Sequence, residues 1–159
     1  MSIEDKLMSS VLGGDADWLP KAFSQAQIHI KLLLAVGPDE LKFSPLDEAI
    51  YQSFRREFPI FEVGLVEDDL HEAMQTGNAS KQWIDWVLEW KDKVKDWDQG
   101  SLLRKDPNQD YISGNTTFCI RIQFLAIEIA RNKEKFNHII VEEAQKQASG
   151  SSGGCCSRC

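Results

Sequence analysis

The sequence predicts an all-α protein: a single compact domain of about five or six helices, with room for a short two-stranded ribbon. The chain of 159 residues is long enough to bury one core, and its 42% apolar and 27% charged content is typical of a globular protein. Apolar residues recur at three- and four-residue steps in several segments. We divide the chain into an N-terminal segment (1–14), a helical domain (15–147) and a flexible tail (148–159).

The first two helices are marked by their ends. Asp15 or Asp17 can cap a helix that has Pro20 in its first turn and stops at Gly37 and Pro38. A second helix, PLDEAIYQSFRREF, follows Ser44, carries an acidic residue three positions after that serine, and ends at Pro59.

A tryptophan-rich helix is predicted over SKQWIDWVLEWKDKVKDW, with Gly100 just beyond its end. One stripe of this helix holds Trp83, Trp86, Val87, Trp90, Val94 and Trp97. Such a stripe usually faces the core, and the competing interpretation is a stacking platform for sugars or bases.

The segment RIQFLAIEIARN is predicted to lie in a central helix that begins near Asn115 or Thr116. On the helical wheel Arg121, Glu128, Arg131 and Asn132 share one side, with Phe124 among them. The other side is apolar apart from Gln123, which we expect to be a buried, hydrogen-bonded amide.

The polar side of this helix has two interpretations. In the structural one, Glu128 pairs with Arg131 and Arg121 reaches acceptors on a neighbouring segment. In the functional one, these side chains form a protein-contact surface, where arginine and aromatic residues are favoured. The candidate partner-binding residues are Arg104, Arg121, Phe124, Glu128 and Arg131.

Two stretches have the composition of strands. IFEVGLV and GSLLR are rich in branched and apolar residues and could pair as a small ribbon.

Catalytic and cofactor motifs are not evident. His29, His71 and His138 are scattered, without metal-ligand spacing, and neither GxGxxG nor GxxxxGK[ST] occurs. Cys119 is expected to be a small core residue. We therefore expect no enzymatic activity, no cofactor and no bound metal.

The net charge of −7 argues against nucleic-acid binding, which depends on clustered lysine and arginine. Charge is uneven, because the stretch from Asp39 to Glu72 holds ten acidic and three basic residues. An acidic side of this kind suits a basic protein partner, and it equally suits a solvated face that keeps the protein monomeric.

The C-terminal tail, ASGSSGGCCSRC, has the composition of a flexible linker followed by cysteines. Cys155, Cys156 and Cys159 are possible lipidation sites, although the match to the C-a-a-X motif is poor. A tail without dedicated chemistry and metal binding by the three thiols are the alternatives.

The predicted compartment is the cytoplasm. No stretch approaches the roughly 20 apolar residues of a membrane span, and the N-terminus has acids where a secretory signal has basic and apolar residues.

Three quoted stretches resemble a known family. DEAIYQSFRREF, GSLLRKD and NTTFCIRIQFLAIEIARNKEKFN are similar to the eukaryotic polysaccharide biosynthesis domain-containing protein 1 family, over about residues 15–137. The resemblance implies a small cytosolic helical protein, members of which act as dedicated chaperones for newly made translation elongation factor 1-alpha and engage its GTP-binding domain. The family label and the tryptophans motivate the alternative, an enzyme or accessory factor of polysaccharide biosynthesis.

Overall fold

The computed structural model describes residues 18–67, 69–76 and 79–157, so the predicted N-terminal segment (1–14) lies outside the described residues. Within these ranges the chain forms six α-helices, a two-stranded sheet and one 3-10 turn. In chain order these are α2 (Trp18–Val36), α3 (Asp47–Glu57), α4 (Leu70–Thr76), α5 (Ser80–Trp90), β1 (Gly100–Arg104), the turn Ser113–Asn115, β2 (Thr116–Ile120), α6 (Arg121–Lys133) and α7 (His138–Ser157). The prediction of a single domain of five or six helices with a short ribbon is confirmed, but the all-α class is too narrow, because the two strands form a sheet.

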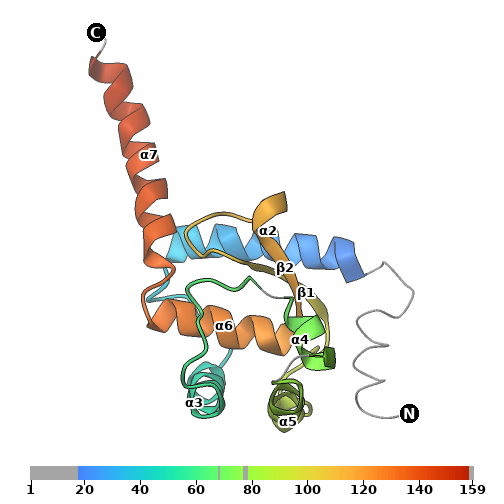
Figure 1. The fold of residues 1–159 in the computed structure, drawn as a ribbon. Helices are drawn as coiled ribbons and strands as arrows, with labels where there is room; N and C mark the ends of the chain where they lie inside the picture. Colours follow the sequence, from blue (N-terminus) through green and yellow to red (C-terminus); the bar gives the residue numbers. More distant parts are fainter. Residues whose placement is uncertain (1–17, 68, 77–78, 158–159) are drawn as a thin grey trace.

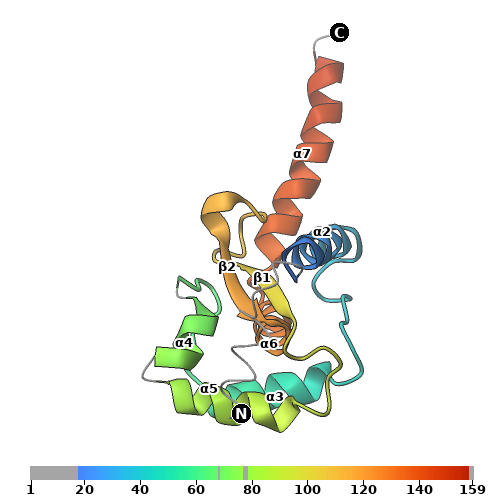
Figure 2. The same ribbon diagram turned by 90° about the vertical axis from the view of Figure 1, so that its right-hand side faces the viewer.

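The helices and the ribbon stack in layers around α6 (Figures 1 and 2). The ribbon lies between α2 and α6, and α3 and α5 pack side by side on the opposite face of α6, roughly perpendicular to its axis. Helix α4 contacts α5 and β2, while α7 projects away from the body. Every layer therefore contacts its neighbour through α6 or the ribbon.

The predicted start of the central helix is wrong, because Thr116–Ile120 forms strand β2 and α6 begins at Arg121. β1 and β2 are antiparallel, with Leu102 opposite Phe118 in the ladder. Threonine and isoleucine favour strands, and the pairing with β1 supplies backbone hydrogen bonds that a helical wheel does not reveal. The change from strand to helix falls where the alternation of apolar residues ends.

The ribbon forms with one of its two predicted strands. GSLLR is strand β1, but IFEVGLV is not its partner, and residues 60–66 contain no strand. A single backbone hydrogen bond, from the Val66 N–H to the Lys105 carbonyl at 2.9 Å, links that segment to the end of β1. β2 occupies the position beside β1 instead.

The tryptophan helix ends at Trp90 rather than Trp97, and turns cover most of the remaining segment. Asp96 has a positive φ of 56°, which a continuing α-helix does not allow. The stripe faces the core as predicted, since Trp83, Trp86 and Trp90 are buried. Because Trp86 and Trp90 are buried, neither ring offers a stacking platform, and their indole N–H groups both donate to Ser53 Oγ on α3.

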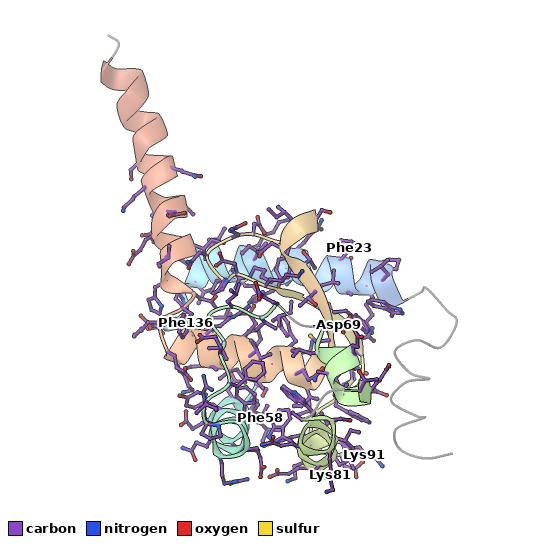
Figure 3. The ribbon with its side chains drawn as sticks, in the orientation of Figure 1. Phe23, Phe58, Asp69, Lys81, Lys91 and Phe136 are labelled. Carbon is purple, nitrogen blue, oxygen red and sulfur yellow. The ribbon has the colours of Figure 1, made fainter. Side chains whose placement is uncertain are left out.

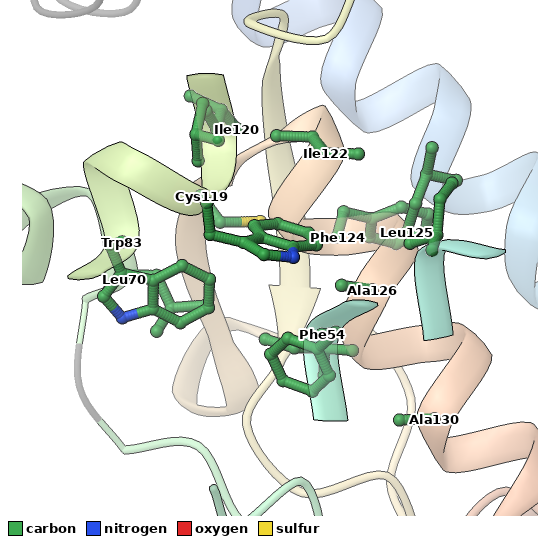
Figure 4. Packing of buried hydrophobic residues seen from close by; sticks show 14 of the residues in the cluster. Phe54, Leu70, Trp83, Cys119, Ile120, Ile122, Phe124, Leu125, Ala126 and Ala130 are labelled. Carbon is green, nitrogen blue, oxygen red and sulfur yellow. The ribbon is translucent and has the colours of Figure 1, made fainter. Parts of the chain in front are cut away.

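The core is built around α6, whose residues from Ile122 to Asn132 are all buried. Figure 4 shows part of the main apolar cluster, to which α3, α4, α5, β2 and α6 contribute. Gln123 is a buried amide as predicted, because its Oε1 accepts the Ile120 N–H at 3.1 Å and its Nε2 donates to the Leu70 carbonyl. Cys119 is also buried, although it lies on β2 and not on the central helix.

Several predicted ends are confirmed. α2 contains Pro20 in its first turn and stops before Gly37, whose φ of 89° favours glycine. At the start of α3, Asp47 accepts the backbone N–H groups of Phe43 and Ser44 at 2.8 and 2.9 Å. The proposed caps Asp15 and Asp17 lie outside the described residues.

Helix α7 continues through the glycine- and serine-rich run up to Ser157, where the sequence predicts a flexible tail. The side chains of residues 150–159 lie outside the description, so Cys155, Cys156 and Cys159 remain candidates from the sequence alone. None of the helices in the described ranges has the length and apolar character needed to cross a bilayer.

Candidate functional site

The conspicuous site in the interior is a buried polar network centred on Glu128 of α6. Arg104 on β1 and Arg131 on α6 lie on either side of this carboxylate, and all three side chains are fully buried. Two cations and one anion in the core are stable only where hydrogen bonds satisfy the remaining polar atoms.

Arg104 is held from several directions. Its Nη2 lies 3.2 Å from both carboxylate oxygens of Glu128 and donates to Asn137 Oδ1 at 2.8 Å. Its Nη1 donates to the Pro107 carbonyl at 2.8 Å. The guanidinium therefore ties β1 to α6, to the loop after β1 and to the residue just before α7.

Arg131 connects two other segments to α6. Its Nε donates to the Val63 carbonyl at 2.8 Å, and its Nη2 donates to the Lys105 carbonyl at 3.1 Å. Its Nη1 lies 3.6 Å from Glu128 Oε2, which confirms the predicted pairing of these two residues. Arg131 therefore holds two segments without regular secondary structure, at Val63 and Lys105, against the central helix.

His29 and Tyr111 complete the network on the side of α2. His29 Nδ1 lies 2.7 Å from the Tyr111 hydroxyl and 3.9 Å from Glu128 Oε2. Burial lowers the pKa of His29 to about 4, although Glu128 opposes this shift, so the ring is neutral at pH 7. Burial also raises the pKa of Tyr111 well above its ordinary value.

Glu128 stays ionised in this environment. Burial alone raises the pKa of its carboxyl, but Arg104, His29, Arg131 and a hydrogen bond from Asn137 outweigh burial and lower it to about 2. The network thus places one carboxylate between two guanidinium groups, and Arg104 Nε and Arg131 Nη1 have no hydrogen-bond partner among the described residues. The structural interpretation of the polar side of α6 applies to Glu128 and Arg131, and Arg104 on β1 has the same structural role, because none of these side chains is at the surface.

His29, Tyr111 and Asn137 were not predicted from the sequence to belong to this network. They lie on α2, in the loop before β2 and just before α7, so no periodic pattern connects them to Glu128. A histidine on the apolar side of α2 was the one available hint.

Arg121 and Phe124 line a different feature, which we call the α2 cleft. This cleft of about 290 Å³ lies between α2, the chain at residues 41–43, β1 and the first turn of α6. Its walls include Ala22, Ala26 and Phe43, and His29 also borders it. The expected pairing of Arg121 with a neighbouring segment is wrong, because its guanidinium has no hydrogen bond or ion pair among the residues described.

A second cleft, the acidic groove, lies between α4, α5 and the chain at residues 58–67. It has a volume of about 360 Å³, with Phe58, Phe61 and Trp83 among its apolar residues and Glu62 and Glu67 as its charged ones. Within the described ranges no lysine or arginine lines it. Figure 3 places Phe58, at this groove, and Phe23, on α2, on opposite sides of α6.

A third groove, about 710 Å³, runs along residues 38–48 beside the end of α6. Lys133 pairs with Glu48 and Lys135 lies 3.0 Å from Asp39, so these charges of the groove neutralise one another. Within the described part of the chain no three histidine, cysteine or acidic residues are grouped to hold a metal ion. Burial strongly raises the pKa of the Cys119 thiol, so this group is not a reactive thiolate.

The fold and the buried network define a single, mostly helical domain whose irregular segments are tied to a central helix by arginine. Residues 15–142 match the family model described as PBDC1 protein, and the chain belongs to this family. The candidate residues Arg104, Arg121, Phe124, Glu128 and Arg131 all lie in the matched region.

Named relatives occur in animals and fungi. Human Protein PBDC1 is 34% identical over 149 residues, which cover 89% of this chain and 63% of the human protein. The Protein PBDC1 homolog of Saccharomyces cerevisiae is 36% identical over 121 residues, which cover 76% of this chain and 83% of the yeast protein. The chain thus spans less than two thirds of its human relative.

A solved structure has the same fold. The solution NMR structure of protein yst0336 from Saccharomyces cerevisiae superposes with a TM-score of 0.68 at 31% sequence identity. The match covers 81% of this chain and 92% of the yeast chain.

Proposed function

We propose that this protein is a non-enzymatic protein-binding factor that acts in the cytoplasm as a dedicated chaperone for newly synthesised translation elongation factor 1-alpha. The client region is its GTP-binding domain. The proposal applies to this chain the role that the family resemblance implies. It includes that the protein acts as a monomer, needs no cofactor and does not bind nucleic acid.

The disposition of the ionisable residues supports a role in binding rather than catalysis. Arg104, Glu128 and Arg131 are fully buried, and Glu128 pairs with both arginines, so these charged groups are not available at the surface. Interactions of this kind position segments of the chain and leave the surface to provide specificity.

The observation that carries the proposal is the acidic groove. Ile60 and Leu65, in the chain that borders it, are 95% and 47% exposed, and large exposed apolar side chains are typical of binding surfaces. Glu62 and Glu67 are exposed beside them, in the acidic stretch noted in the sequence. Apolar contact area surrounded by negative charge suits a basic client, because charge complementarity speeds encounter and rejects acidic partners.

Polysaccharide biosynthesis receives no support from particular residues. Its motivations were the family label and the stripe of tryptophans, of which Trp83, Trp86 and Trp90 are buried. Only the family label remains for this alternative.

The experiment is capture of elongation factor 1-alpha as it is made. The factor is translated in a cell-free system with the tagged full-length protein present, and the captured fraction is measured with GTP or GDP in excess. We expect the wild-type protein to retain the new factor, and a double change, Glu62→Lys with Glu67→Lys, to lower retention several-fold.

A matched variant separates a local effect from a change in net charge. Glu142 and Glu143 are exposed on α7, and Glu142→Lys with Glu143→Lys changes the net charge equally, away from the groove. This variant should retain the client. Absence of elongation factor 1-alpha from the wild-type capture contradicts the proposed function, whereas equal retention by all three proteins removes only the acidic groove as its site.

A further inference from the structure

We propose that the α2 cleft binds a peptide segment of a partner in which a large apolar side chain lies next to an aspartate or glutamate. The site is distinct from the acidic groove and does not depend on which client the protein serves. Four features of the cleft lead to this occupant.

The first feature is size. A volume of about 290 Å³ is at the lower limit for small-molecule pockets and is sufficient for one large side chain. Ala22 and Ala26, one helical turn apart on α2, leave this space open, with Leu41 and Phe124 among the other apolar residues that line it.

The second feature is an apolar rim larger than the cleft itself. Ile28 and Leu32, also one turn apart on α2, line the cleft and are 57% and 45% exposed. A partner whose side chain fills the cleft would cover both residues with its neighbouring atoms. This arrangement favours a chain segment over an isolated small molecule, since binding of a segment removes more apolar surface from water.

The third feature is unpaired positive charge. Arg55, Arg56, Arg104 and Arg131 each lie within 4 Å of a carboxylate, whereas Arg121 does not pair with any described residue. Arg121 is half-buried, and the exposed ammonium of Lys42 also borders the cleft. Among the residues that the structure describes, no aspartate or glutamate lines it. A carboxylate from a partner would give Arg121 the charge-assisted hydrogen bonds that it lacks.

The fourth feature is an unsatisfied nitrogen. His29 is 5% exposed, its Nδ1 faces Tyr111, and its Nε2 has no hydrogen-bond partner among the described residues. A buried polar atom without a partner costs free energy, which a backbone amide of the bound segment would recover. Because a backbone amide has both a donor and an acceptor, it fits either tautomer of the imidazole.

The test is a selection from random 12-residue peptides displayed on phage, made against the full-length protein. We expect the enriched peptides to combine phenylalanine, leucine, isoleucine or tryptophan with adjacent aspartate or glutamate. Their affinities are then measured by fluorescence anisotropy with synthetic labelled peptides.

Two variants and a matched control place the binding. Arg121→Glu should weaken it at least about ten-fold by reversing the charge, and Ile28→Asp should do so by making the rim polar. Lys31→Glu makes the same charge change at an exposed position of α2 that does not line the cleft, and should leave binding unchanged.

Several outcomes overturn the proposal: no enrichment, enrichment of lysine- or arginine-rich peptides, or acidic peptides that bind wild type and Arg121→Glu equally. A second copy of the chain is the competing occupant. If sedimentation equilibrium finds that the wild type is a dimer and Ile28→Asp is a monomer, the occupant of the cleft is a second copy of the chain and not a partner peptide.

Discussion

Arg104 and Glu128, 24 residues apart in the chain, form an ion pair in which Arg104 Nη2 lies 3.2 Å from both carboxylate oxygens and both side chains are fully buried. The pair joins β1 to α6 and brings the start of α7 into the same network through Asn137. It is therefore a connection between layers of the fold rather than a feature of one helix.

Removing the negative charge of this network should strongly destabilise the fold. Glu128→Gln leaves Arg104 and Arg131 buried without a counter-charge, and breaking a buried pair in this way costs about 3 to 5 kcal/mol. Urea unfolding followed by circular dichroism measures the loss in the free energy of unfolding.

An exposed glutamate provides the comparison. Glu48 pairs with Lys133 at the surface, where water screens both charges, so Glu48→Gln should leave the urea midpoint almost unchanged. Equal losses from the two substitutions would contradict the assignment of the buried network as a stabilising connection.

Stability should fall as the solution is acidified below pH 6.5. The pKa of His29 is about 4 in the folded protein and near 6.5 when unfolded, so the unfolded chain binds the extra proton in this interval. Between pH 7.5 and pH 5 this difference amounts to about 2 kcal/mol of the free energy of unfolding. Below pH 4.5, protonation of Glu128 in the unfolded chain acts in the same direction, since its folded pKa is about 2.

His29→Gln isolates this contribution. The variant has no imidazole at position 29 to protonate, so its unfolding free energy should change less between pH 7.5 and pH 5 than that of the wild type. An identical pH dependence of the two proteins would assign the acid sensitivity to other groups.

Ser53 should contribute more to the stability of the fold than the size of its side chain suggests. Its buried hydroxyl accepts hydrogen bonds from the indole nitrogens of Trp86 and Trp90, at 2.7 and 3.1 Å. Ser53→Ala leaves both donors without this acceptor and should cost about 1 to 3 kcal/mol in denaturant unfolding. Ser24→Ala, at an exposed position of α2, is the matched substitution and should cause no loss.

Gly100 should not tolerate a larger side chain. A Cβ atom at this position would lie 2.6 Å from Cε3 of Trp18, so the ring would have to move. Gly100→Ala should lower the free energy of unfolding by about 1 to 3 kcal/mol and shift the tryptophan emission. Gly114→Ala is the control, because no atom of the described residues lies within 4 Å of the corresponding Cβ, and it should have little effect.

The helices with clear ends were predictable from the sequence. Gly37 and Pro38 stop α2, and Asp47 accepts backbone N–H groups at the start of α3. These effects act over a few residues, so the sequence contains the necessary information. The buried face of α5 was predictable for the same reason, since its tryptophans recur at helical spacing.

The candidate site was predictable only in part. The pairing of Glu128 with Arg131 follows from their spacing on one helix. The partners of Arg104 could not be predicted, because Glu128 and Asn137 are distant in sequence. Arg121 shares the polar side of the helical wheel with Glu128 and Arg131, but it is only half-buried and lines the α2 cleft together with the buried Phe124.

The sequence alone determined the helical character of the domain, its central apolar segment and its family resemblance, because periodicity, helix ends and motifs are local properties of the chain. The tertiary structure decided that Thr116–Ile120 forms a strand, since its partner strand ends twelve residues before it and the hydrogen bonds exist only in the folded pair. It also decided which charges are buried. Arg104, Glu128 and Arg131 meet in the core, whereas Arg121 has no pairing partner in the described part of the chain, because burial and charge pairing depend on which distant segments pack together.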